Sequence, residues 1–335
     1  LRFPFLYKKL AKKGAHFFSV PAAFTYTTGI THWESLLRAR AIENGCYVFA
    51  PAQCGYHDNG RRTFGNSMII DSNGEIIGEL SNKKEEILKL SLKNPISSLE
   101  NVKLFSRKCI SLKDSLLRSS SGIICEFKRK SPSNNNINYK STISEVVRGY
   151  QKAGAAGLSI LTNKKYFDGN IEDIIEIRNF AEIPILRKEF IISEYQIFEA
   201  KSIGADAILL IASILTSEDI LNFSSLAKNL GLEVLVEVHS YEELKKISGN
   251  NIDIIGVNNR NLDTLEIDLN NSIEMYKEIP DKFLKISESG ISKVESILKL
   301  REVGYQGFLI GENFMKSDDP MEEAYNFIKE VENEI

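Results

Sequence analysis

The sequence has few cysteines, no long apolar run and almost no surplus charge, and each shortage excludes a class of protein. Its four cysteines, Cys46, Cys54, Cys109 and Cys125, form no CxxC pair and have no zinc-ligand spacing. A disulfide framework or zinc module is therefore not expected, and reduced thiols in a cytoplasmic protein are the better interpretation. No apolar run approaches the roughly 20 residues that cross a bilayer, and the first residues lack the pattern of a secretory leader.

The charge balance argues against polyanionic partners. The 42 basic and 45 acidic residues leave a net charge of −3, which gives no reason to expect nucleic acid or an anionic membrane as a partner. A hydrophobic fraction of 43% with 26% charged residues is ordinary for a globular protein. The length of 335 residues suits one large domain or two medium ones.

The apolar pattern changes near residue 95, which suggests two domains, 1–94 and 95–335. Before the change, strand-like runs at 16–20, 46–50 and 67–70 are separated by turn-rich stretches. A helix is predicted over 31–44, because Trp33, Leu36, Leu37 and Ala41 share one face of it. Residues 71–74 (DSNG), between two apolar runs, predict a hairpin turn.

The second part contains eight short apolar runs that alternate with polar-faced helical stretches. Runs of this kind are typical of buried parallel strands, and eight such repeats predict a (β/α)8 TIM barrel over a doubly wound open sheet, the alternative. Capping boxes are predicted at Thr142 with Glu145, Ser193 with Gln196, Ser240 with Glu243, and Ser292 with Glu295. The eight runs are 122–125, 158–161, 183–186, 207–211, 233–236, 252–257, 283–286 and 307–310.

Ionisable and amide side chains recur where the predicted strands end. In a (β/α)8 barrel the active site lies at those C-terminal ends, where converging carboxylates and ammonium groups exchange protons. A single lysine or glutamate there is more often a solvated loop charge. Six strand ends that carry them together reverse that expectation. The side chains in question are Glu126, Lys128, Lys188, Glu237, Asn258, Arg260, Glu288 and Glu312.

Glycines after the last two strands suggest a phosphate site. Gly290 and Gly311 allow the backbone to approach a ligand closely, and the phosphate site of many barrels lies at this place. Each glycine by itself fits a tight turn equally well. Together with Ser289 they favour a phosphorylated substrate.

These motifs resemble those of the indole-3-glycerol phosphate synthase family, over about residues 96–332. The matching segments follow one another at strand ends along the chain, so chance agreement is remote. They are ICEFKRKSPS (124–133), SILT (159–162), YF (166–167), LRKEF (186–190), EVH (237–239), NNRNL (258–262), SESGI (287–291) and LIGE (309–312).

The resemblance implies a reaction: carboxyphenylamino-deoxyribulose phosphate closes to indole-glycerol phosphate, losing carbon dioxide and water. It implies no metal or organic cofactor, and it admits another tryptophan-pathway enzyme as a protein partner. Lys188 is then the general acid at the substrate carbonyl, and Glu237 with Lys128 serves the dehydration. Glu126 and Asn258 orient the substrate and the lysines.

The resemblance also implies where the substrate binds. Phe167, Phe190 and Leu209 form an apolar wall for the anthranilate ring, although plain barrel packing explains them equally well. Arg260 pairs with a carboxylate or a substrate oxygen, and Ser131 and Glu288 are further substrate contacts. The phosphate donors are Ser289, Gly290, Gly311 and the amide of Glu312, whose side chain points away from the anion.

Two departures from the family are noted. Glu189 follows Lys188 where the family often has aspartate. The helical segment that opens the family and covers the barrel mouth is recognised only in its later part, about 97–117, so weaker closure over the substrate is expected.

Residues 1–80 resemble the second half of a nitrilase-type carbon–nitrogen hydrolase, a layered α/β sandwich. The carrying segments are LRFP (1–4), HWE (32–34), RARAIEN (38–44) and GNSMIID (65–71). The family's nucleophilic cysteine, lysine and first glutamate would precede residue 1, and only Glu34 matches an accessory carboxylate. Cys46 and Cys54 are interpreted as buried structural residues. Amide hydrolysis by this route needs a thiolate, so this part is expected to be inactive.

Other interpretations stay open at this point. A phosphoribosylanthranilate isomerase would share the barrel and phosphate site, but the set of Lys128, Lys188 and Glu237 speaks against its acid–base pair. A non-catalytic scaffold or relic is the alternative from another class. The fusion itself is compatible with a natural gene fusion, a truncated gene model or an assembly artefact.

Overall fold

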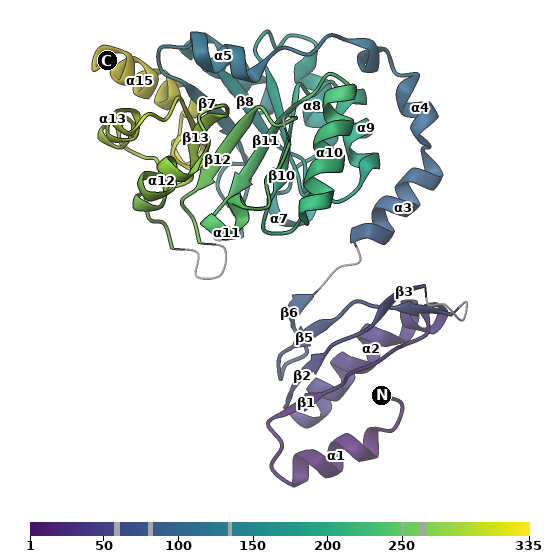
Figure 1. Cartoon of the computed structure of the whole chain (residues 1–335). Helices are drawn as coiled ribbons and strands as arrows, with labels where there is room; N and C mark the ends of the chain where they lie inside the picture. Colours follow the sequence, from purple (N-terminus) through teal and green to yellow (C-terminus); the bar gives the residue numbers. More distant parts are fainter. Residues whose placement is uncertain (57–60, 80–82, 133–135, 250, 262–265) are drawn as a thin grey trace. The chain divides into compact units, whose positions relative to one another are not determined.

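The computed structural model describes residues 1–56, 61–79, 83–132, 136–249, 251–261 and 266–335. The chain divides into two compact units, Leu1–Lys89 and Leu90–Ile335 (Figure 1). Across the described ranges, no helix has the length and apolarity to span a membrane.

The first unit is a small α/β layer. Its four-stranded sheet has the order β1-β2-β5-β6, with β1 and β2 parallel and the other neighbours antiparallel. Strands β3 and β4 pair separately. The elements are α1 (Pro4–Lys12), β1 (Phe17–Ser19), α2 (Tyr26–Asn44), β2 (Tyr47–Ala50), β3 (Cys54–Tyr56), β4 (Arg62–Phe64), β5 (Met68–Ile70) and β6 (Ile76–Glu79).

Only one face of this sheet is covered. Trp33, Leu37 and Ala41 of α2 are fully buried in one cluster with alternate residues of the strands, such as Val48 and Ile70. The residues that alternate with them are exposed, because strand side chains point to opposite faces in turn. On that second face Phe17, Tyr47, Phe49 and Ile69 are 60%, 45%, 40% and 37% exposed. The unit is therefore a partial nitrilase-like sandwich fragment with half of a core.

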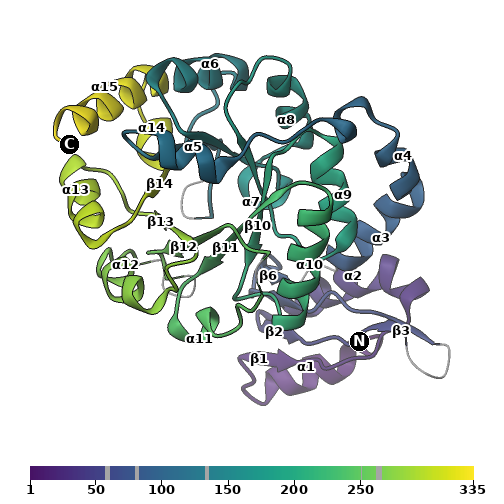
Figure 2. The same cartoon turned by 45° about the horizontal axis from the view of Figure 1, so that its top comes forward.

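The second unit is a closed barrel of eight parallel strands in the order β7 to β14, so the predicted TIM barrel is confirmed (Figures 1 and 2). The strands are β7 (Ile123–Phe127), β8 (Gly157–Leu161), β9 (Ile185–Lys188), β10 (Ala207–Ile211), β11 (Glu233–Val238), β12 (Ile254–Asn258), β13 (Leu284–Glu288) and β14 (Gly307–Ile310).

Helices surround the barrel, as Figure 2 shows most clearly. Those before the first strand are α4 (Ile96–Glu100), the 3-10 turn η1 (Lys103–Ser106) and α5 (Leu112–Arg118), whereas α3 (Lys83–Lys93) spans the boundary between the two units. Those after it are α6 (Ile143–Ala153), α7 (Lys164–Phe167), α8 (Ile171–Arg178), α9 (Glu194–Ser202), α10 (Ser217–Asn229), α11 (Tyr241–Leu244), α12 (Asn270–Met275), η2 (Tyr276–Glu278), α13 (Val294–Val303), α14 (Glu312–Met315) and α15 (Pro320–Asn333).

Strand alternation divides the barrel core in two. In β7, Ile123 and Cys125 pack outward with the helices, whereas Ile124 packs inside the barrel. The inner cluster contains Leu112 and Leu116 of α5, which close the end where the strands begin. The opposite end, where the strands finish, holds the polar residues.

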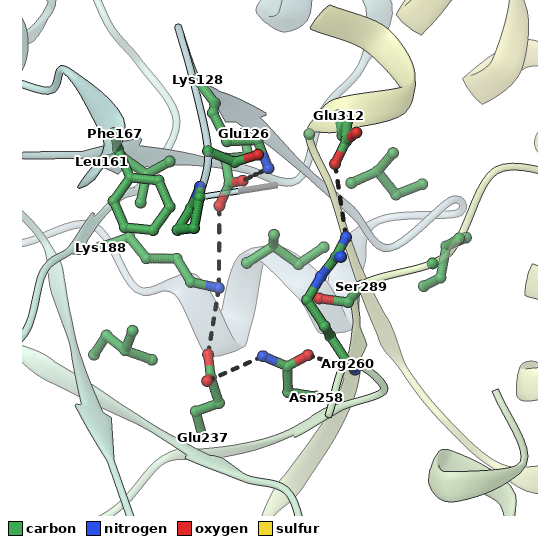
Figure 3. Close-up of a pocket in the computed structure, with 18 of the residues that line it drawn as sticks. Glu126, Lys128, Leu161, Phe167, Lys188, Glu237, Asn258, Arg260, Ser289 and Glu312 are labelled. Carbon is green, nitrogen blue, oxygen red and sulfur yellow. Dashed lines mark hydrogen bonds and ion pairs between the residues drawn. The ribbon is translucent and has the colours of Figure 1, made fainter. Parts of the chain in front are cut away.

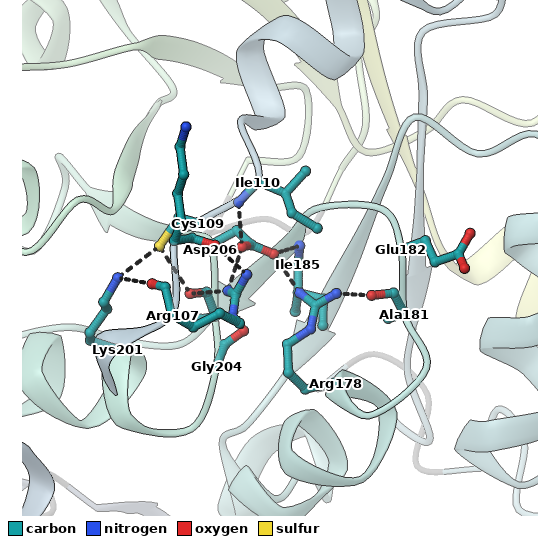
Figure 4. Close-up of polar contacts among 12 residues, drawn as sticks. Arg107, Cys109, Ile110, Arg178, Ala181, Glu182, Ile185, Lys201, Gly204 and Asp206 are labelled. Atoms are coloured by element: carbon teal, nitrogen blue, oxygen red, sulfur yellow. Dashed lines mark hydrogen bonds and ion pairs between the residues drawn. The ribbon is translucent and has the colours of Figure 1, made fainter. Parts of the chain in front are cut away.

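A buried polar clamp fixes the segment before α5 to the start of β10 (Figure 4). The Asp206 carboxylate, fully buried, accepts hydrogen bonds from Arg107 at 2.5 Å and from the Ile110 amide at 2.7 Å. Its other oxygen accepts from Arg178 at 2.7 Å and from the Ile185 amide at 2.8 Å. Four donors satisfy one carboxylate, so burial leaves it without an unmet hydrogen bond.

Most local predictions are confirmed, and some helix starts are not. The turn after β5 is as predicted, with Gly74 at φ +86° donating its amide to the Asp71 carbonyl. Thr142 and Glu145 form the predicted capping box. The other three boxes are wrong in whole or in part, because their side chains have other partners or the helix starts elsewhere.

Ser240 accepts from the Glu243 amide, but the Glu243 side chain bonds His239 instead of Ser240. The Ser193 side chain makes no cap hydrogen bond. Gln196 Oε1 accepts a hydrogen bond from the Ile192 amide instead of the Ser193 amide. The cap residue of α13 is Lys293, one position after the predicted Ser292.

Candidate active site

A cavity of about 530 Å³ opens where the barrel strands end (Figure 3). Nearly all of the site residues predicted from the sequence line it. They are Glu126, Lys128, Ser131, Phe167, Lys188, Phe190, Leu209, Glu237, Asn258, Arg260, Ser289, Gly290, Gly311 and Glu312.

The two-residue period of a strand explains why charged groups meet inside the barrel. Leu186, Leu235 and Ile286 belong to the inner core, so the residue two positions further along each strand also points inward. Those residues are Lys188, Glu237 and Glu288, and Glu126 stands in the same relation to Ile124 on β7.

Lys188 lies at the centre of three carboxylates. Its Nζ donates a hydrogen bond to Glu288 Oε2 and lies 3.5 Å from Glu237 Oε2 and 4.0 Å from Glu126 Oε2. Burial alone would lower the pKa of Lys188, but the carboxylates of Glu288, Glu237 and Glu126 outweigh it and raise that pKa. The ammonium group therefore stays charged across the neutral range.

Glu288 differs from its predicted place. It does not line the cavity but lies beneath it, 1% exposed, with its carboxylate against Lys188. Burial raises the pKa of Glu288, Lys188 lowers it, and Glu237 and Glu126 raise it again, for a result of about 7. Burial thus favours the protonated form of the Glu288 carboxyl group, and the neighbouring Lys188 opposes this.

Glu126 links the two lysines. Its Oε1 pairs with Lys128 Nζ at 3.0 Å, and its Oε2 accepts from the Ser159 hydroxyl at 3.1 Å. Burial would raise the pKa of Glu126, but Lys128, Lys188 and Ser159 lower it below its ordinary range. The Glu126 side chain packs against Gly311, where an added Cβ would lie 2.7 Å from Oε1. Gly311 is therefore needed for the close packing of Glu126.

Glu237 is held by an amide and an imidazole. Asn258 Nδ2 donates to its Oε1 at 3.1 Å, and His239 Nε2 lies 3.5 Å from the same oxygen. His239 Nδ1 lies 3.2 Å from Glu243 Oε2. Burial would lower the pKa of His239, but Glu243 and Glu237 raise it. The sequence motif contained His239, but nothing in its type marked it as a neighbour of the site.

Arg260 and Glu312 face each other across the mouth, as Figure 3 shows. Arg260 Nη2 lies 3.6 Å from Glu312 Oε2, and Glu312 Oε1 pairs with Lys316 at 2.6 Å. Burial would raise the pKa of Glu312, but Lys316, Lys128 and Arg260 lower it. The predicted pairing of Arg260 with a carboxylate is present in the protein itself.

An apolar wall stands beside the charged groups. The rings of Phe167 and Phe190 stack at a centroid distance of 6.3 Å and an interplanar angle of 24°. Leu161, Leu209 and Ile211 continue this wall around the cavity. A flat aromatic ring fits between such a wall and the polar groups opposite.

The corner predicted to bind phosphate has a left-handed backbone. Ser289 has φ +69° and Gly290 has φ +76°, and an added Cβ at Gly290 would lie 2.2 Å from Ile267 Cγ2. Gly311 precedes α14, and both segments line the same side of the cavity. Of the motif residues, Ser133 and Leu262 lie outside the described ranges.

Sequence reasoning gave no role to two residues that join strand ends at the site. Glu189 accepts from Thr162 at 2.9 Å and from Asn163 at 3.0 Å, joining the ends of β8 and β9. Asn259 joins the ends of β12 and β13. Both lie within segments that carry the family resemblance, but their residue types alone do not reveal these contacts. Within the described ranges, no group of three or more His, Cys, Asp and Glu side chains is arranged to hold a metal ion.

A closed parallel barrel with a cavity of buried acids and lysines at its strand ends is the arrangement of a (β/α)8-barrel enzyme. The family model for indole-3-glycerol phosphate synthase matches residues 78–327. The chain belongs to this family.

Curated relatives agree with this assignment. The indole-3-glycerol phosphate synthase of Bacteroides thetaiotaomicron is 48% identical over 222 residues, which cover 66% of this chain and 85% of the relative. That of Caldanaerobacter subterraneus subsp. tengcongensis is 40% identical over 257 residues, covering 76% of this chain and 98% of the relative. The match reaches nearly the whole of that relative and the family model begins at residue 78, so the family's opening segment extends further toward the N-terminus than the part recognised in the sequence, about 97–117.

The first unit matches a second family. The model for carbon-nitrogen hydrolase matches residues 1–96, so the two matches overlap. The C. elegans NitFhit protein is 42% identical over 29% of this chain and 26% of its own, with a TM-score of 0.24. In this unit Cys46 is buried as predicted, and Glu34 is an exposed partner of Arg38 at 3.2 Å. The Cys54 side chain lies outside the described part.

Proposed function

We propose that residues 95–335 form the catalytic domain and convert 1-(2-carboxyphenylamino)-1-deoxyribulose 5-phosphate to indole-3-glycerol phosphate, carbon dioxide and water. The observation that carries the proposal is the cluster of Lys188 with Glu126, Glu237 and Glu288 beside the stacked Phe167 and Phe190. The substrate has the matching parts: a carbonyl oxygen that gains a proton and an aromatic ring that needs an apolar wall.

We assign the first proton transfer, which accompanies ring closure, to Lys188. The aromatic carbon that bears the carboxylate attacks the substrate carbonyl carbon, and the carbonyl oxygen takes a proton from Lys188. The charged ammonium also stabilises the negative charge that develops on this oxygen. Glu288, with its pKa near 7 and its contact with Lys188, is placed to return the proton. Loss of carbon dioxide then restores the aromatic ring.

We assign the second stage of the reaction, the dehydration, to Glu237 and Lys128. The new hydroxyl group leaves as water after it receives a proton, and the neighbouring carbon loses one as the indole double bond forms. Lys128 donates and Glu237 accepts in this assignment, while Asn258 holds Glu237 and Glu126 holds Lys128. In this assignment the substrate phosphate is bound by Ser289, Gly290, Gly311 and the amide of Glu312. The hydroxyl groups of the substrate chain are contacted by Ser131 and Arg260.

The test is product formation followed by indole fluorescence. Lys188→Met should lower kcat about 10²–10⁴-fold, the range for loss of a general acid. Lys285→Met is the matched control, since Lys285 is a buried lysine on β13 that pairs with Asp281 at 3.0 Å, away from the cavity. Full activity of the Lys188 variant, or an equal loss in the control, would contradict the assignment.

We further propose that residues 1–94 have no hydrolase activity of their own. The thiol of Cys46 is buried and donates to the Ala15 carbonyl at 3.1 Å, which suits packing rather than attack on an amide. Amide hydrolysis that is lost in a Cys46→Ala or Cys54→Ala variant would overturn this. A tryptophan-pathway enzyme as partner remains a prediction from the resemblance, and a cytoplasmic location remains a prediction from the cysteine pattern.

A further inference from the structure

Asn259 is a buried amide that no step of the proposed reaction uses. It follows β12 directly and is 3% exposed. Its Nδ2 donates to Ser287 Oγ at 2.9 Å, to the Glu288 carbonyl at 3.0 Å and to the Ser289 carbonyl at 3.1 Å. One side-chain amide thus contacts three successive residues at the end of β13.

The other end of the same side chain is fixed to α12. Asn259 Oδ1 accepts from the Ser272 amide at 3.1 Å and from the Ser272 hydroxyl at 2.7 Å. The Ser272 carbonyl accepts in turn from the Tyr305 hydroxyl at 2.7 Å. Because Ser272 is fully buried, the orientation of the Asn259 amide is determined on both sides.

The carbonyl groups that Asn259 holds belong to a strained turn. Ser289 has φ +69°, which is uncommon for a residue with a side chain, and Gly290 follows at φ +76°. Such backbone persists only where the surroundings over-determine it. The bonds to the carbonyls of Glu288 and Ser289 supply that constraint, and the turn they fix lines the cavity.

We infer that Asn259 is a positioning residue that holds the left-handed turn Ser289–Gly290 in the form that binds the substrate phosphate. This inference rests on the proposed function for the phosphate corner. Asn259 does not touch the cavity itself, so it acts through the turn. Loss of its donor should weaken phosphate binding more than it slows the chemistry at Lys188.

The experiment compares Asn259→Asp with Asn271→Asp in the full chain. The first change replaces the Nδ2 donor by an oxygen that faces two carbonyls. Asn271 is the matched control, because its Nδ2 donates to the carbonyls of Asn258 at 3.1 Å and His239 at 3.3 Å but not to the turn. Asn259→Ala, which adds no buried charge, serves if the aspartate variant does not fold.

Inorganic phosphate is the binding probe, measured by calorimetry, beside KM and kcat for the synthase reaction. We expect Asn259→Asp to weaken phosphate binding and raise KM about tenfold or more, with kcat within threefold, and Asn271→Asp to leave phosphate binding within twofold. Unchanged phosphate affinity in Asn259→Asp, or a fall in kcat alone, would overturn the inference.

The remaining outcomes separate the two proposals. A wild-type chain that binds phosphate but forms no indole product contradicts the proposed function, while the calorimetric comparison still tests Asn259. A wild-type chain that does not bind phosphate overturns the inference. Failure of both Asn259 variants to fold, with a folded Asn271 variant, would make Asn259 a folding residue and also overturn it.

Discussion

The pKa of Glu288 provides a test of how the buried charges are coupled. Burial raises the pKa of Glu288 to about 7 in the folded protein from its ordinary value of 4.5. Between those values the folded state binds more protons than the unfolded state, so the free energy of unfolding falls as pH rises. We expect the wild type to lose at least about 1.4 kcal/mol relative to Glu288→Gln from pH 4.5 to pH 8.

Denaturant unfolding at a series of pH values measures this difference. Glu182→Gln, which removes an exposed carboxylate from the same barrel, is the control. If the unfolding free energy of the wild type relative to Glu288→Gln stays constant or increases as pH rises, Glu288 has no raised pKa.

Gly256 on β12 has no side chain, and the Glu288 carboxylate occupies the space that a Cβ at this position would fill. An added Cβ would lie 2.2 Å from Glu288 Oε1, so Gly256→Ala must displace the carboxylate from Lys188. We expect a loss of about 1–3 kcal/mol in unfolding free energy, as for other overpacked cores, together with a lower kcat. Gly78→Ala on β6 is the control, since its Cβ would meet Ile69 at an ordinary 3.6 Å. Equal effects of the two changes would refute this.

At the residue scale, the sequence predicted the cavity lining better than its support. Lys188, Glu237 and Asn258 are recognisable because each ends an apolar run. Glu288 ends its run in the same way, yet it lies below the cavity, because its carboxylate turns toward Lys188 and the space over Gly256. A strand pattern gives the face of a side chain and not its rotamer. Asn259 was missed for a similar reason, since its partners come from two other elements.

At the scale of elements, strand positions were predicted well and strand ends less well. The predicted runs stop at apolar residues, but β7, β9, β11 and β13 each continue for two further residues, into the charged groups of the site. Polar residues remain in a strand when the barrel mouth offers them partners. The predictions of helix starts each depended on a few side-chain hydrogen bonds. At Gln196 the expected bond is absent, because its Oε1 accepts from the Ile192 amide.

The clamp at Asp206 joins elements that are distant in sequence, which is why the sequence did not reveal it. Asp206→Asn should cost about 3–5 kcal/mol of unfolding free energy, because Arg178 and Arg107 then lose a buried counter-charge. Asp253→Asn is the matched control: Asp253 precedes β12 as Asp206 precedes β10, but its pair with Lys228 at 2.7 Å is more exposed. Urea unfolding of both variants gives the comparison. Equal losses of unfolding free energy in the two variants would mean that the Asp206 clamp stabilises the barrel no more than the Asp253–Lys228 pair does.

At the scale of the whole molecule, the chain joins a complete barrel to an incomplete sandwich. We expect a chain that starts at residue 78, where the family match begins, to keep kcat and KM within about twofold. The same chain should also self-associate less, because the exposed sheet face with Phe17, Tyr47, Phe49 and Ile69 is gone. Steady-state kinetics and sedimentation at several concentrations measure both effects.

A chain that starts at residue 95 is the informative comparison. It lacks α3 and should show a higher KM, because the segment before the barrel strands belongs to the family match. Loss of activity in the chain from residue 78 would contradict the independence of the barrel. The fold class could be predicted from the eight-fold repeat, but the start of the family segment could not, since its helices have no strand to mark them.

The three acids around Lys188 have a consequence for how the protein tolerates change over generations. A buried lysine with one counter-charge is left uncompensated when that partner is substituted, but Lys188 keeps two acidic neighbours after any single loss. Inheritance of one such substitution therefore leaves Lys188 with acidic neighbours, although the role proposed for the lost acid is lost with it. The charge of Lys188 is thus robust to single errors and vulnerable to paired ones.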